Sequence, residues 1–427
     1  MIYRDERWTA PRRLTAIAAL LSIGAGAGLA QRGEPGTLAA VRAVAPAPVE
    51  AVVDAATAPV LSTVSATAAR MAEDRLTQAE RLVQAEIRRG AFPGAALAAG
   101  RGAQMAMMKG IGNAEWGRHE VDAERTIYDI ASLTKVVGAT TAVMLLVEDG
   151  KMALDAPVRR YLPEFSGGNR DRVTVRHLLA HTSGLPAGAA APGTPAQALA
   201  AQIRTPLKTA PGARMVYSDV SMVVLWAAAE RAAGEPLDGL LQRRVWDPLQ
   251  MRSTGFNPGG EACDRCSPSW KRPDGTPVRG VVHDPTARRL GGVTGNAGLF
   301  STAADLARFA AMMASGGELE GTRILREETI RTFTARQPGA GNRALGWETP
   351  QATGGSAGAQ FSRRAFGHTG YTGTSMWIDP ERGTWTVLLA NRTFDPQAPN
   401  RIQALRRAVN DRVAEAAELA DVAALAE

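Results

Sequence analysis

Apolar positions divide the chain into a helical start, two strand-like runs, a long helical middle and a mixed end. Residues 73–90 carry apolar side chains at helical spacing, including Leu76, Val83 and Ile87, and predict a helix that ends near Gly90. Two short runs, AALAAG and AQMAMMKGIG, follow this helix and are typical of β-strands. The chain therefore begins its ordered part with a helix followed by two strands.

The remaining pattern predicts that both chain ends share one sheet. Helical patterns separated by Pro/Gly loops fill residues 132–290, and residues 257–290 look like an inserted loop. After residue 370, TSMWIDPERGTWTVLLANRT predicts a β-hairpin that turns at residues 380–383, and residues 400–427 predict a closing helix. We expect an α/β (α+β) fold in which an antiparallel sheet, flanked by helices from both ends, adjoins a mostly helical lobe across a cleft.

One apolar segment carries two residues that a buried helix does not need. The run IASLTKVVGATTAVMLLVEDG is apolar nearly all round and predicts a central helix over residues 131–148. Ser132 and Lys135 share one face of this helix at its N-terminal end, where negative charge is favoured. Burial should lower the pKa of Lys135 toward neutrality, which would make it a base for Ser132. A lysine whose ammonium reaches solvent from the helix end is the alternative.

Composition and charge restrict the class of protein. With 427 residues, 45% of them hydrophobic and 21% charged, the chain can bury one large domain or two smaller ones. Its net charge of +7 comes from scattered arginines rather than from basic runs, and it favours a solvated basic surface over nucleic-acid binding. Only five lysines occur, and Lys135 is the one that follows a serine by three positions. Unlike arginine, lysine can accept a proton near neutral pH.

The N-terminal region predicts export. Residues 1–30 combine a positive start, a short apolar run and small residues before Gln31, which is typical of an export signal; an uncleaved membrane anchor is the alternative. Residues 31–72 are rich in Ala and Pro and predict a linker to a domain over residues 73–427. We therefore expect a periplasmic or extracellular protein, either free or tethered by its N-terminus.

Cysteine and histidine give no metal site. Cys263 and Cys266 form a single C-x-x-C, which in an exported protein favours a local disulfide over half a zinc site. His177 and His181 have helical spacing, but no third ligand accompanies them, so capping and packing explain them better. We expect no metal and no cofactor.

Two further polar motifs follow Ser132 and Lys135 along the chain. Tyr217, Ser218 and Asp219 precede an apolar helix, and His368-Thr369-Gly370 precedes a strand. Alone, the first motif is typical of a helix N-cap and the second of a turn. Their order S-x-x-K, Y-S-D, H-T-G resembles the class C serine β-lactamases with the related D-alanyl-D-alanine carboxypeptidases and esterases. Segments such as YDIASLTK, VRHLLAHTSGLP and HTGYTGTSMWIDP extend the resemblance over about residues 75–410.

The resemblance implies a role for each motif. Ser132 would be the acylated nucleophile, Lys135 its base and Tyr217 a second proton carrier. The backbone N–H groups of Ser132 and Tyr371 would form the oxyanion hole. The resemblance also implies that the substrate binds beside Asp219 and beside the segment His368, Thr369, Gly370 and Tyr371.

Two departures from the resemblance affect the expected substrate. Asp219 stands where the lactamases usually have Asn, and it can accept but not donate a hydrogen bond. His368 stands where they usually have Lys, so the charge that would hold a substrate carboxylate is only partial near neutral pH. We therefore expect an esterase-like or carboxypeptidase-like hydrolase, acting on a small or peptidoglycan-derived acyl donor, rather than an efficient β-lactamase. The alternative is a non-catalytic, penicillin-recognising wall-binding or sensor protein.

Overall fold

An antiparallel six-stranded sheet organises the computed structural model, which describes residues 61–353 and 355–426. Its strand order is β11-β12-β13-β1-β2-β3. The strands are β1 (Gly94–Arg101), β2 (Gln104–Glu115), β3 (Arg118–Glu120), β11 (Phe366–Thr369), β12 (Ser375–Asp379) and β13 (Thr384–Ala390). The predicted export signal and most of the predicted linker lie outside the described residues.

Both ends of the domain meet in the middle of this sheet, as the sequence predicted. Strand β1 pairs with β13 from Ala95 opposite Ala390 to Arg101 opposite Thr384. The β12–β13 hairpin turns at residues 380–383, also as predicted. Nearly every position of β1 and β13 is buried, because helices cover both faces of these central strands.

Alternate side chains of the central strands pack against different helices. Ala95, Leu97 and Ala99 share a core with helices α1 (Glu73–Arg88) and α11 (Ile402–Ala426). Ala96 and Ala98 face the opposite way, into the core that contains α9 (Ala303–Ala314). This division follows from the two-residue period of a strand. It places the first and last helices together on one face, as expected for helices from both chain ends.

The packed body begins before the predicted domain boundary at residue 73. Leu61, Ala69 and Met71 are buried, and Thr63 forms a parallel bridge with Met105 on β2. Composition assigned these residues to the linker, but their apolar side chains add to the core beside α1 and β2.

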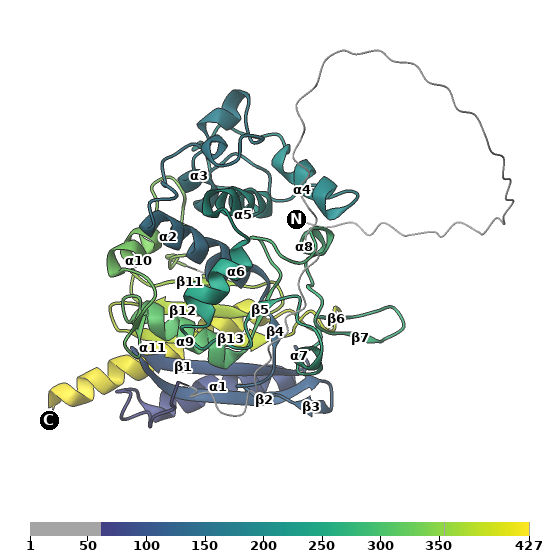
Figure 1. Cartoon of the computed structure of the whole chain (residues 1–427). Coiled ribbons are helices and arrows are strands. Elements are labelled where there is room, and N and C mark those ends of the chain that lie inside the picture. Colours follow the sequence, from purple (N-terminus) through teal and green to yellow (C-terminus); the bar gives the residue numbers. More distant parts are fainter. Residues whose placement is uncertain (1–60, 354, 427) are drawn as a thin grey trace, which may run out of the picture. The chain divides into compact units, whose positions relative to one another are not determined.

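A helical lobe follows β4 (Tyr128–Asp129) and lies above the β11 edge of the sheet, with β2 and β3 at the far side (Figure 1). Its helices are α2 (Thr141–Glu148), α3 (Val175–Leu179), α4 (Pro195–Ile203), α5 (Asp219–Ala233) and α6 (Leu237–Leu241). The predicted helix over 131–148 is present, but it opens with a 3-10 turn (Ala131–Leu133) and a π-helical turn (Lys135–Thr140) before α2. The span Ala131–Glu148 is apolar enough to cross a membrane, yet most of it lies buried in the core.

The predicted insertion at residues 257–290 is built from short elements. They are α7 (Glu261–Asp264), β6 (Trp270–Lys271), β7 (Pro277–Val278) and α8 (Pro285–Arg289), next to the small sheet of β4, β5 (Gly255–Phe256) and β8 (Leu299–Ser301). Cys263 and Cys266 are free thiols here, so the expected disulfide is absent from the described structure. Burial raises the pKa of Cys266 to about 12.

The last short elements lie along the chain between α9 and β11. They are β9 (Glu318–Leu319), β10 (Thr322–Arg323) and α10 (Glu327–Thr334).

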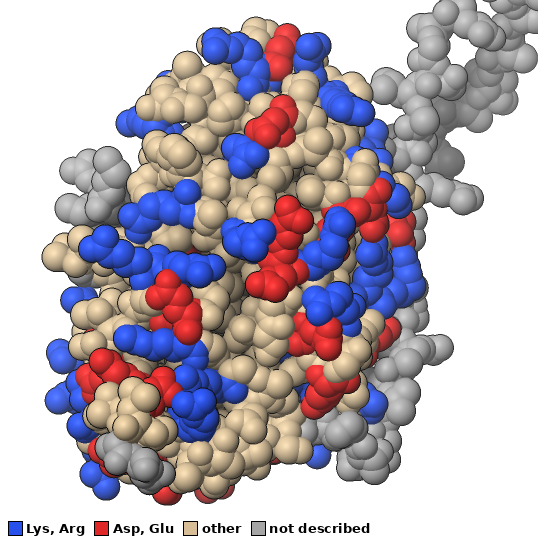
Figure 2. Space-filling view, turned by 90° about the vertical axis from the view of Figure 1, so that its left-hand side faces the viewer, with Lys and Arg blue, Asp and Glu red and all other residues tan. Residues whose placement is uncertain are grey.

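Figure 2 shows Lys and Arg side chains interspersed with Asp and Glu over one face. This mixed surface agrees with the scattered charges of the sequence.

Candidate active site

The turn that carries Ser132 is held in a strained conformation. Ala131 has a φ of 47°, unusual for a residue with a side chain. Its N–H donates to the Asp129 carboxylate over 2.9 Å, and the hydroxyls of Thr372 and Thr374 donate to the carbonyls of Asp129 and Ile130. Such strain persists only where the surroundings fix the backbone, and it is common at functional sites.

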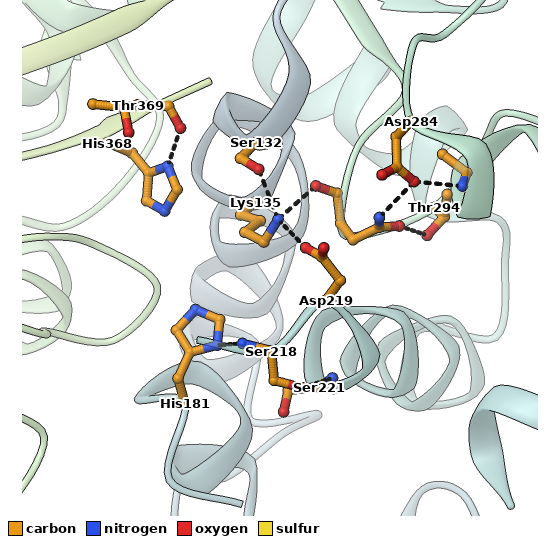
Figure 3. A network of polar contacts seen from close by, with 12 residues as sticks. Ser132, Lys135, His181, Ser218, Asp219, Ser221, Asp284, Thr294, His368 and Thr369 are labelled. Atoms are coloured by element: carbon orange, nitrogen blue, oxygen red, sulfur yellow. Dashed lines mark hydrogen bonds and ion pairs between the residues drawn. The ribbon is translucent and has the colours of Figure 1, made fainter. Parts of the chain in front are cut away.

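Lys135 is fully buried and lies at the centre of a polar network (Figure 3). Its Nζ is 3.0 Å from Ser132 Oγ, 2.8 Å from the Asn296 carbonyl oxygen and 2.7 Å from Asp219 Oδ1. The Asn296 and Asp219 oxygens can only accept, so they take two N–H bonds in either protonation state. The third position faces Ser132: an ammonium donates to the hydroxyl, whereas a neutral amine accepts its proton. The network therefore suits a general base as well as a resting ammonium.

The expected low pKa of Lys135 is wrong. Burial does lower the pKa of this amine, but the Asp219 carboxylate and the Tyr217 hydroxyl together outweigh burial and raise it above its ordinary value. The sequence could show that Lys135 would be buried, but it could not show that the carboxylate of Asp219 would lie 2.7 Å away. Lys135 therefore rests as an ammonium, and it must lose a proton before it can accept one from Ser132.

Tyr217 lies among four side chains from separate segments. Its ring centre is 5.0 Å from Lys135 Nζ and 4.9 Å from the guanidinium carbon of Arg343. The rings of His181 and His368 lie at centroid distances of 4.7 and 5.9 Å. The next residue, Ser218, caps α5: its hydroxyl accepts from the N–H of the third helical residue, so the predicted cap also orients Tyr217.

His368 does not supply the positive charge that the sequence suggested. Burial, the Arg343 guanidinium and the Lys135 ammonium hold the pKa of His368 well below its usual range. Its Nδ1 lies 2.9 Å from the Thr369 carbonyl oxygen, which can only accept, and its Nε2 lies 3.4 Å from Arg343 Nη1, which can only donate. This pairing defines a neutral imidazole with the proton on Nδ1. Both ring nitrogens are thus engaged within the protein.

The loop after β11 is fixed against the turn that carries Ser132. The guanidinium of Arg406, on α11, donates to the carbonyls of Gly370 and Thr374 over 2.6 and 2.7 Å. A Cβ at Gly370 would lie 2.5 Å from the Ile130 carbonyl oxygen, so only glycine fits. Tyr371 is 63% exposed, and no acceptor within residues 61–353 or 355–426 takes its N–H. That N–H is available to an oxyanion.

A polar cavity of about 220 Å³ adjoins this loop, lined by His283, Tyr371, Arg392, Asp395 and Asn400 among others. The guanidinium carbon of Arg392 lies 4.4 Å from the centre of the exposed Tyr371 ring. Its Nε is buried without a hydrogen-bond partner, and the described residues contain no carboxylate paired with it. The cavity therefore offers an unpaired cation beside the 370–374 loop.

The structure brings all eight predicted site residues into this region, but it also adds several that the sequence did not single out. They are Asp129, His181, Asn296, Arg343 and Arg392. Only His181 carried a signal, because it belongs to the HLLAHTSGLP segment, although we expected it to be structural.

The described residues contain no group of three or more His, Cys, Asp or Glu side chains that could hold a metal ion.

Comparisons with known proteins identify the family of the chain. A family model described as "Beta-lactamase" matches residues 79–410. The Escherichia coli (strain K12) protein named "Putative D-alanyl-D-alanine carboxypeptidase" is 30% identical over 314 residues, which cover 64% of this chain and 70% of that protein. A protein of the same name from Salmonella agona (strain SL483) is also 30% identical, with 64% and 71% covered.

Solved structures show the fold at lower identity. EstCE1, "a hydrolase with promiscuous acyltransferase activity", has a TM-score of 0.63 at 22% identity. The match covers 79% of this chain and 99% of the EstCE1 chain. A penicillin-binding protein homologue from Caulobacter crescentus has a TM-score of 0.65 at 21% identity, covering 80% and 98%. A class C beta-lactamase also reaches 0.65 at 18% identity, covering 80% and 96%. The fold is therefore that of the beta-lactamases, with the expected antiparallel sheet.

Proposed function

Since the chain belongs to the beta-lactamase family and is a serine hydrolase, we propose that it cleaves ester or peptide acyl donors through an acyl-enzyme on Ser132. The 3.0 Å contact between Lys135 Nζ and Ser132 Oγ supports this role most directly. Without a base at this distance, a serine hydroxyl is a weak nucleophile.

Acylation then proceeds in balanced steps. Lys135 first gives one proton to solvent. Its neutral amine then accepts the proton of Ser132 as Oγ attacks the acyl carbon. The N–H groups of Ser132 and Tyr371 stabilise the oxyanion. Tyr217, whose ring centre lies 5.0 Å from Lys135 Nζ, gives its phenolic proton to the leaving group as the acyl–leaving-group bond breaks. It takes in exchange the proton that Lys135 accepted from Ser132. In deacylation, water attacks the acyl carbon with the help of the same groups, and Ser132 Oγ is the leaving group.

Esterase-like or carboxypeptidase-like substrates suit the site better than β-lactams. One oxygen of Asp219 pairs with Lys135 and the side chain remains 36% exposed, so it presents an acceptor where the lactamases usually have an amide. The neutral His368 leaves Arg392 as the cation available to a substrate carboxylate. The similarity to proteins named as D-alanyl-D-alanine carboxypeptidases favours a substrate with such a carboxylate.

Labelling tests the nucleophile. Incubation with a fluorophosphonate should add one adduct at Ser132, which peptide mass spectrometry would locate and which Ser132→Ala should lack. Ser183 and Ser356 are buried serines that serve as internal controls. An adduct on either of them, with Ser132 unmodified, would contradict the assignment.

Matched substrates test the carboxylate preference. We expect the carboxylate-bearing member of a pair of otherwise identical esters to have the lower KM. Arg392→Gln should raise that KM about tenfold, as expected for a lost charge-assisted hydrogen bond, and leave the neutral ester unchanged. Arg363→Gln, at an exposed arginine, is the control. Equal effects on both esters would exclude carboxylate recognition by Arg392.

The same assay separates the enzyme from a non-catalytic penicillin-recognising protein. A hydrolase releases product over many turnovers after the first acylation, whereas a sensor stops after one equivalent.

Export remains part of the proposal, based on the composition of residues 1–30.

A further inference from the structure

Arg343 brings a permanent positive charge into the site from a segment without a recognised motif. Its guanidinium carbon lies 4.9 Å from the centre of the Tyr217 ring, and its Nη1 lies 3.4 Å from Nε2 of His368. The residue is only 8% exposed, so bulk water screens these contacts little. Arginine stays protonated throughout the pH range in which enzymes work.

Glu348 holds this guanidinium in place. Its carboxylate accepts from Arg343 Nη2 over 2.9 Å, and its backbone exchanges two hydrogen bonds with Gly367, the residue before His368. The loop that carries Arg343 is therefore joined to β11, and the guanidinium cannot leave Tyr217 and His368 without breaking the ion pair.

Two cations thus contact the ring of the residue that relays protons. Lys135 is one, but its ammonium must give up a proton during the reaction. Arg343 is the other, and its charge does not change. A ring with negative charge on its oxygen attracts a nearby cation more strongly than a neutral phenol does, because part of that charge is delocalised over the ring.

We propose that Arg343 is a positioning residue that acts as the fixed cation of this active site. It keeps His368 a neutral hydrogen-bond acceptor and stabilises Tyr217 while Tyr217 transfers a proton between Lys135 and the leaving group. The inference rests on the proposed function, because that function assigns the proton relay to Tyr217.

The environment of His368 makes the role measurable. The groups that face its ring are Arg343 from the loop before β11, Lys135 from the π-helical turn, His181 after α3 and Tyr217 before α5. Removing Arg343 deletes one of two neighbouring cations. The imidazole should then bind a proton at a higher pH than in the native protein.

The test compares Arg343→Gln/Glu348→Gln with Arg343→Lys. The double variant removes both charges, so that no buried carboxylate is left unpaired. With a neutral ester, we expect it to lower kcat about 10- to 100-fold with little change in KM, as for a desolvated cation–π contact. Arg343→Lys should recover most of kcat. NMR of the histidine side chains should show His368 titrating at higher pH in the double variant only.

A control and two outcomes complete the design. Arg308→Gln/Glu320→Gln removes another ion pair with a buried arginine, outside the site, and should leave kcat and the titration of His368 unchanged. If the folded Arg343 double variant keeps native kcat and native His368 titration, or if Arg343→Lys is as impaired as the double variant, the inference is wrong. Failure of the native protein to acquire a fluorophosphonate at Ser132 would instead reject the proposed function.

Discussion

At the scale of single residues, the site is defined by which charges are paired. Lys135 is paired with Asp219 and Arg343 with Glu348, while Arg392 has no carboxylate partner within the described residues. The pairing at Lys135 opposes activation of Ser132, because the carboxylate stabilises the ammonium. In the proposed mechanism, Asp219 therefore controls the pH at which Lys135 can act as the base.

Asp219→Asn should move the pH dependence of the reaction downward. Loss of the carboxylate lowers the pKa of Lys135, and kcat/KM rises as this amine deprotonates, so the acid limb of the profile should shift to lower pH by about one unit or more. The measurement is kcat/KM for a neutral ester between pH 5 and 10, where a downward shift of one unit appears as an about tenfold higher value at a given pH. Lys135→Arg is the control and should be inactive throughout, since arginine cannot accept the proton. An acid limb that stays in place in Asp219→Asn would show that another group titrates.

At the scale of elements, helix α11 supports a loop that lies far from it in sequence. Arg406 reaches from α11 to the carbonyls of Gly370 and Thr374, whose loop in turn bonds to the turn before Ser132. Helix α11 therefore fixes the distance between the Tyr371 N–H and Ser132.

Arg406→Leu should weaken both stability and acylation. Two buried carbonyls lose their donor, so we expect the free energy of unfolding to fall by about 2–4 kcal/mol. Ester turnover should fall as well, because the oxyanion donor is displaced. Urea unfolding and initial rates measure the two effects. Arg407→Leu, at the exposed neighbour on the same helix, should change neither; native turnover in a destabilised Arg406→Leu would show that the loop holds its position without α11.

At the scale of the whole molecule, no continuous segment contains the site. Its groups come from six places along the chain. These are the turn after β4, the segment just after α3, the N-terminus of α5, the loop before β8, the loop before β11, and β11 itself. The described body belongs to a single compact unit, and it must be folded throughout for these groups to meet.

Activity should therefore be lost in one step with the fold. In a urea titration, we expect the rate of fluorophosphonate labelling at Ser132 to fall in the same transition as tryptophan fluorescence and far-UV circular dichroism. The buried tryptophans Trp246, Trp347, Trp377 and Trp385 report on both the lobe and the sheet. Labelling that disappears at a lower urea concentration than either signal would mean that the lobe opens before the sheet unfolds.

Local patterns determined much of this protein from its sequence alone. Periodicity located the terminal helices, the strands of both chain ends, the β12–β13 hairpin and the buried helix that carries Ser132 and Lys135. These features depend on residues close together in the chain, where propensity and burial leave a regular pattern. The three polar motifs also indicated the family, although not the substrate.

Tertiary structure alone decided the electrostatics of the site. The sequence correctly indicated that Lys135 would be buried, but the sign of its pKa shift depended on Asp219, 84 positions away in the chain. The sequence likewise assigned the cation to His368, whereas folding brings Arg343 beside it and leaves the imidazole neutral. The physical reason is that an electrostatic interaction depends on distance in space and on the surrounding dielectric, and neither is encoded in local spacing.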